Sequence, residues 1–97
     1  MYYLIITAQI TDYGKFKSYA VATAEYVAEL GGEYIVRAGQ TELLEGVFDM
    51  GSKVVISRWK SKEHALSFWQ SEKYQSVLKP LRENTGTFTV LLIEGAG

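Results

Sequence analysis

Apolar positions along this 97-residue chain follow two different spacings. Residues 2–10, 33–39, 53–60 and 87–94 are runs rich in β-branched and aromatic side chains, which predict β-strands. From residue 13 to residue 30, apolar side chains instead recur every three or four positions, which is the spacing of one face of a helix. A second helical region lies before the last strand. The predicted order is therefore strand, helix, strand, strand, helix, strand.

Local signals mark where the helices begin and end. Asp12 is suited to cap the first helix, and Gly31 can adopt the left-handed conformation that ends it. Ser61 is suited to cap the second helix, and Pro80 predicts a kink or break because proline removes a backbone donor. The long connection between the second and third strands is predicted to hold a short extra strand at residues 42–45.

The element order predicts an α+β fold. Right-handed crossovers place both helices on one face of the sheet. The expected architecture is a ferredoxin-like βαββαβ sandwich with a four-stranded antiparallel sheet, whose central strands are residues 2–10 and 53–60. The length fits one domain over residues 1–97.

The sheet face away from the helices is predicted to be too apolar to meet water. Alternation places Ile5 and Ile56 on this face, together with Ile35 and Arg37. An exposed apolar surface of roughly several hundred Å² marks an interface or a pocket. We therefore expect two copies to pair through this face into a dimeric α/β barrel, with higher homo-oligomers left open. A one-residue slip of the strand would move Arg37 to the helix face.

Composition narrows the possible functions. The net charge of −1 argues against a nucleic-acid or anionic-membrane partner, because phosphate binding needs a cationic face. The lack of Cys and the single His argue against thiolate and paired-His metal sites, so neither a metal nor a cofactor is expected. No apolar run approaches the ~20 residues of a membrane helix and the N-terminus lacks a signal-peptide pattern, so we expect a cytoplasmic protein.

A series of short motifs runs in order along nearly the whole chain. It comprises Gly31-Gly32-Glu33-Tyr34-Ile35-Val36-Arg37-Ala38-Gly39, Leu44-Glu45-Gly46, Trp59-x-Ser61, Phe68-Trp69, Ser71-x-x-Tyr74-Gln75 and Ile93-Glu94-Gly95. This series resembles the uncharacterised family called domain of unknown function 1330. The chain departs from that family's pattern at Val47, Arg58 and Lys60, which weakens any transfer of a ligand preference.

The resemblance implies a fold and an assembly. The family is similar to the dimeric α/β-barrel superfamily, which includes cofactor-free monooxygenases of the antibiotic-biosynthesis type, muconolactone isomerase-like proteins and haem-degrading enzymes. It implies no settled reaction.

Arg37 and Glu45 are the first candidate ligand-binding residues. Inside the barrel, the planar guanidinium of Arg37 would bind a carboxylate or another anion. The alternative is an ion pair between Arg37 and Glu45 across the hairpin, because a buried Arg is normally paired.

Tyr19, Tyr74 and Arg82 are further candidates for the lining of a ligand pocket. Tyr74 and Arg82 would supply a phenol and a guanidinium at its mouth. The alternative is that Tyr74 packs in the core while Arg82 caps carbonyl groups at a helix end. Tyr19 lies on the apolar stripe of the first helix, where aromatic residues usually belong to the core.

His64 is the weakest candidate, as a catalytic general base. An unperturbed His titrates near neutral pH, which suits proton transfer. The simpler interpretation is a solvated surface residue, and a haem axial ligand is a third interpretation by analogy with the superfamily.

Together these features predict a small homodimer that binds a small organic molecule between its sheet and its helices. In one interpretation it also transforms that molecule, by proton transfer or oxygen insertion without a metal. The alternative is a non-enzymatic dimerisation or structural module whose barrel is filled by its own side chains. A void of roughly 300 Å³ or more near Arg37 would favour the ligand-binding interpretation.

Overall fold

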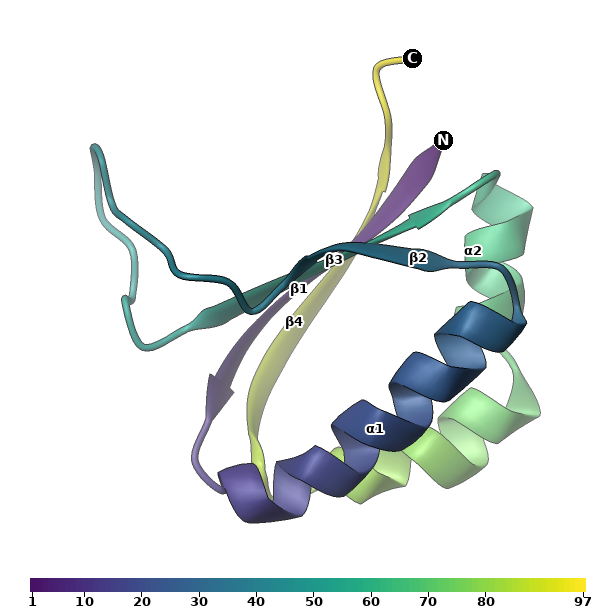
Figure 1. The fold of residues 1–97 in the computed structure, drawn as a ribbon, viewed down its shortest axis with the longest axis horizontal. Helices are drawn as coiled ribbons and strands as arrows, with labels where there is room; N and C mark the ends of the chain where they lie inside the picture. Colours follow the sequence, from purple (N-terminus) through teal and green to yellow (C-terminus); the bar gives the residue numbers. More distant parts are fainter.

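The computed structural model describes residues 1–97 and has two layers, a sheet and the helices that cover one of its faces (Figure 1). In chain order the elements are β1 (Tyr2–Ile10), α1 (Tyr13–Glu29), β2 (Glu33–Arg37), β3 (Lys53–Trp59), α2 (Lys62–Trp69), η1 (Lys73–Leu78), η2 (Lys79–Arg82) and β4 (Gly86–Glu94). The four strands lie in the order β2-β3-β1-β4, and all neighbours are antiparallel. The predicted ferredoxin-like α+β fold is confirmed.

The predicted caps begin both helices. The Asp12 carboxylate accepts a hydrogen bond from the Lys15 amide at 3.0 Å, and the Ser61 hydroxyl accepts one from the His64 amide at 3.0 Å. Gly31 follows α1 with a φ of 86°, in the left-handed region that glycine tolerates best. The break predicted at Pro80 is also present, because the chain changes there from the π-helical turn η1 to the 3₁₀ turn η2.

The extra strand predicted at residues 42–45 is wrong. Residues 38–52, which we call the arm, contain no strand and extend away from the body of the molecule (Figure 1). Ala38 has a φ of 56°, so the chain turns out of the sheet as soon as β2 ends. Residues 42–45 consequently have no neighbouring strand to which their backbone N–H and C=O groups could hydrogen-bond. Leu44 in this segment is 87% exposed.

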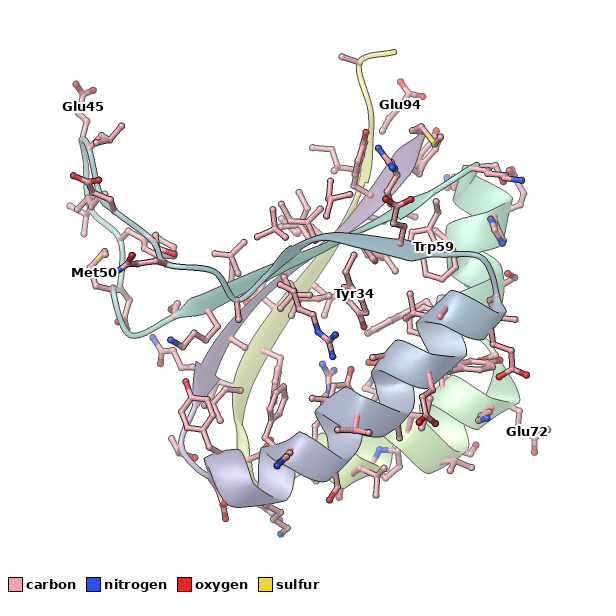
Figure 2. The ribbon with its side chains drawn as sticks, in the orientation of Figure 1. Tyr34, Glu45, Met50, Trp59, Glu72 and Glu94 are labelled. Carbon is pink, nitrogen blue, oxygen red and sulfur yellow. The ribbon has the colours of Figure 1, made fainter.

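The core lies between the sheet and a helical layer formed by the C-terminal half of α1, α2 and η1. Trp59 and Tyr74 are each 1% exposed, and Trp59 stacks on Phe68 with ring centroids 5.2 Å apart. The indole nitrogen of Trp59 donates to the Ser57 hydroxyl at 2.9 Å, which satisfies both buried groups. Figure 2 shows Trp59 beneath the sheet, on the helix side.

The opposite face of the sheet carries a continuous apolar row. In cross-strand register, Val36 pairs with Ile56, Ile56 with Ile5, and Ile5 with Leu91, so the row crosses all four strands. No helix covers this face (Figure 1), and Leu91 is 56% exposed. The predicted apolar face is therefore present.

The placement of Arg37 on that apolar face is wrong. The pairing of β2 with β3 shifts between Tyr34 and Val36, so one extra residue lies in β2. Such a bulge reverses the inward and outward alternation beyond it. Arg37 consequently pairs with Val55 and points to the helix side, whereas Arg58 stays on the outer face in an ion pair with Glu33 at 3.0 Å.

Candidate ligand-binding site

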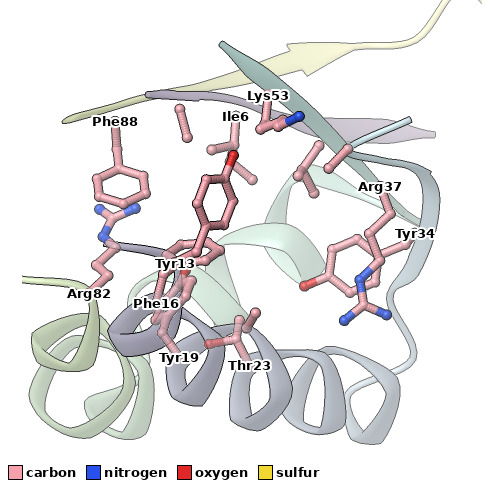
Figure 3. A pocket seen from close by; sticks show the side chains of 14 residues that line it. Ile6, Tyr13, Phe16, Tyr19, Thr23, Tyr34, Arg37, Lys53, Arg82 and Phe88 are labelled. Atoms are coloured by element: carbon pink, nitrogen blue, oxygen red, sulfur yellow. The ribbon is translucent and has the colours of Figure 1, made fainter. Parts of the chain in front are cut away.

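A cavity of about 290 Å³ lies between the sheet and the N-terminal half of α1 (Figure 3). Ten of its fourteen lining residues are hydrophobic, so an apolar molecule could replace water there. The lining consists of Ile6, Ala8, Tyr13, Phe16, Tyr19, Ala20, Thr23, Tyr34, Arg37, Ala38, Lys53, Val55, Arg82 and Phe88.

Small residues between large ones create this space. Ala8 of β1 and Ala20 of α1 line the cavity with single methyl groups. Phe16 and Phe88 stack at one end with ring centroids 5.9 Å apart, and Tyr34 of β2 lies at the other (Figure 3). The sheet and the helix are thus held apart where neither supplies a large side chain.

Thr23 places an unsatisfied polar group in the lining. Thr23 is 4% exposed, and its Oγ1 has no hydrogen-bond partner. Thr23 borders both the main cavity and an adjoining void of about 20 Å³ beside Tyr74. Because a buried hydroxyl without a partner is costly, this oxygen is available to a polar atom of a bound molecule or to a water.

Three cationic side chains line the cavity. The Arg37 guanidinium lies over the Tyr34 ring at 5.0 Å, and the Arg82 guanidinium lies over the Phe88 ring at 4.4 Å. Figure 3 shows these two Arg side chains on opposite sides of the cavity, with Lys53 on the sheet side. None of the three is in an ion pair, since the ion pair of the structure joins Arg58 to Glu33.

Two tyrosine hydroxyls meet beside the cavity. The Tyr19 and Tyr74 oxygens are 2.8 Å apart, so one donates to the other. Burial is the main cause that raises the pKa of Tyr74 far above its usual value, and burial likewise raises the pKa of Tyr34 to about 12. The Tyr74 and Tyr34 phenols are therefore neutral at physiological pH and act as hydrogen-bond donors and acceptors.

These raised pKa values predict a loss of stability in alkali. Between about pH 10 and pH 12 the unfolded state releases a tyrosine proton that the folded state retains, so the free energy of unfolding falls as pH rises. The expected slope is about 1.4 kcal/mol per pH unit for each such tyrosine. Urea unfolding, measured at several pH values across this range, gives the free energy of unfolding at each pH. This free energy should fall less steeply with pH in Tyr74→Phe than in the wild type. Equal slopes for the two proteins would contradict the assignment to Tyr74.

The structure brings four of the five predicted ligand-binding residues together. Tyr19, Arg37 and Arg82 line the cavity, and Tyr74 lies behind Tyr19 in the core. Glu45 instead lies at the end of the arm (Figure 2), so neither its place in the pocket nor its ion pair with Arg37 is present.

His64 lies apart from the cavity. Its Nε2 is 2.5 Å from the Leu30 carbonyl oxygen at the C-terminal end of α1, and its ring meets Trp59 edge to face. This contact ties α2 to the end of α1. The arrangement gives His64 a structural contact and no place in the lining of the cavity.

Several lining residues were not predicted from the sequence. Thr23 had a usable signal, because it is a polar residue on the otherwise apolar stripe of the first helix. Alternation along β2, β3 and β4 places Tyr34, Lys53 and Phe88 on the helix side of the sheet, but whether they line a cavity depends on how far α1 stands from the sheet, which the sequence does not show.

Comparisons with known proteins agree with this fold. The model of a family described as a domain of unknown function (DUF1330) matches residues 1–96. A solved structure from Nitrosomonas europaea, provisionally named an antibiotic biosynthesis monooxygenase, is 16% identical. The similarity covers 100% of each chain with a TM-score of 0.66, which is a likeness of fold. Among curated proteins, none matches this sequence. Separately, none of the helices has the length and apolar character needed to span a bilayer.

Proposed function

Since this chain belongs to the DUF1330 family, whose description leaves its function open, we propose a function from the cavity: the protein is a homodimer that binds a small organic molecule between its sheet and α1. The observation that carries this proposal is the cavity of about 290 Å³, close to the lower size of ligand pockets. Its mainly apolar lining, with a few polar groups around it, is typical of such sites.

The outer face of the sheet supports the homodimer. An apolar row that crosses four strands is too large a surface to leave in water without a function. A second copy presents the same row, so two such faces bury each other in a symmetric interface. Leu44 and the fully exposed Val47 in the arm would add further apolar surface to this contact.

The cavity also weighs against the alternative function. A purely structural dimerisation module would need no internal void, because well-packed interiors leave few spaces larger than a water molecule. Side chains do not fill the space between β1 and α1. We therefore favour ligand binding over a barrel filled by its own residues.

A second candidate function is a reaction on the bound molecule, by oxygen insertion or isomerisation without a cofactor. The fold shared with the protein provisionally named a monooxygenase favours it. Arg37, Arg82 and the neutral Tyr34 hydroxyl would orient the molecule and stabilise negative charge on it, rather than act as nucleophiles.

Filling the cavity should abolish binding of a neutral apolar probe. Ala20 lines the cavity, so Ala20→Trp places an indole in the space that a ligand would occupy. The fluorescence of phenylnaphthylamine, which rises in apolar surroundings, is expected to increase with the wild-type protein. With Ala20→Trp the affinity should fall by at least about tenfold, since the probe loses most of its apolar contact area.

Ala28→Trp is the matched control, because Ala28 is exposed on the same helix. It should bind the probe like the wild type. Equal binding by all three proteins would place the probe elsewhere and overturn the proposed function.

A further inference from the structure

The charge around the cavity is one-sided. The chain has eleven acidic residues against ten Lys and Arg, for a net charge of −1. None of the fourteen lining residues is acidic, whereas three of them are cationic: Arg37, Lys53 and Arg82. A bound molecule is therefore surrounded by three cationic groups, none of which is paired with a carboxylate of this protein.

We propose that the ligand is an organic carboxylate with a flat apolar body, which the cavity holds by its aromatic walls while Arg82 binds the carboxylate and Arg37 attracts it to the opening. This inference rests on the proposed function, since it names the class of molecule that the same cavity takes. The apolar lining favours a ligand with an apolar body, and the unpaired cations favour a ligand with a negative charge.

The two Arg side chains are held by rings rather than by acids. Arg82 lies over the ring of Phe88 at 4.4 Å and near that of Tyr19 at 5.8 Å. A guanidinium stacked in this way keeps the N–H groups at its edge free for a planar, two-pronged contact with a carboxylate. Arg37 is placed in the same manner over Tyr34.

Exposure separates the roles of the three cations. Arg37 and Lys53 are exposed and would attract an anion to the opening of the cavity, whereas Arg82 is half-buried. A charged contact strengthens as water is excluded, so Arg82 is expected to contribute most to the affinity. Thr23 Oγ1 and the Tyr34 hydroxyl supply hydrogen bonds for further polar atoms of the ligand.

The test compares two probes of nearly the same size and shape, of which one is charged and the other neutral. Naphthoate and naphthamide have the same ring system, but only naphthoate carries a negative charge. Calorimetric titration of the wild-type protein should give an affinity for naphthoate at least about tenfold higher, because hydrogen bonds to charged groups are the stronger ones. Added salt should weaken naphthoate binding and leave naphthamide binding unchanged.

Variants locate the charged contact. Arg82→Gln should lower the affinity for naphthoate about tenfold or more and leave that for naphthamide nearly unchanged, which also shows that the cavity remains folded. Arg37→Gln should act in the same direction with a smaller effect. Lys62→Gln makes the same charge change on α2, outside the lining, and should leave both affinities unaltered.

The outcomes distinguish this inference from the proposed function. Equal affinities for naphthoate and naphthamide, both lost in Ala20→Trp, would overturn the carboxylate and leave the ligand cavity in place. An equal loss of naphthoate binding in Arg82→Gln and Lys62→Gln would also overturn it. If phenylnaphthylamine binds identically to the wild type and Ala20→Trp, the proposed function itself fails.

Discussion

Replacing Ile56 with aspartate is expected to convert the proposed homodimer into monomers. Ile56 lies in the middle of the apolar row, between Ile5 and Val36 on neighbouring strands. Pairing two such faces would bury two carboxylates without cationic partners, at a cost of several kcal/mol each. We expect the dimer to weaken at least about hundredfold, measured by sedimentation equilibrium at micromolar protein.

Val77→Asp is the matched control for this change. Val77 is 56% exposed in η1, in the helical layer and away from the sheet face. The same charge placed there should leave the dimer intact. A wild-type protein that sediments as a monomer, or two variants that dissociate equally, would contradict the proposed interface.

Trp59→Ala is expected to remove much of the stability of the fold. The Trp59 side chain is 1% exposed, stacks on Phe68 and meets His64 edge to face. Truncating a buried aromatic residue costs about 3–5 kcal/mol, against a total of about 5–15 kcal/mol for an ordinary domain. The loss also leaves the Ser57 hydroxyl without the indole N–H that it accepts.

Chemical denaturation followed by circular dichroism measures this loss. Val77→Ala, which truncates an exposed side chain, should change the free energy of unfolding by no more than about 0.5 kcal/mol. A Trp59→Ala protein as stable as Val77→Ala would show that the aromatic cluster is not the centre of the core.

Most of the fold could be predicted because its signals are local. The four strands and the caps at Asp12 and Ser61 follow from spacing and residue type, and each lies where the sequence indicates. The strand predicted at residues 42–45 shows the limit of such signals. A strand forms only beside another strand, and the left-handed turn at Ala38 takes the arm away from the sheet.

The site was less predictable because it depends on tertiary geometry. One extra residue in β2 moves Arg37 from the outer face of the sheet to the lining of the cavity. None of the residue types in that strand predicts a bulge. Glu45 would face Arg37 only across a hairpin between β2 and a strand at residues 42–45, and that strand does not exist. Thr23 could have been found, since a hydroxyl on an apolar helical stripe has to meet a partner or a cavity.

The location of a bound molecule tests the account most directly. In the protein labelled at its methyl groups, nuclear Overhauser contacts from naphthoate protons should reach the methyl groups of Ala20, Thr23 and Val55, which all line the cavity. Contacts confined to Ile5 and Leu91 on the outer face of the sheet would contradict the account, because the ligand would then lie where we place the partner subunit.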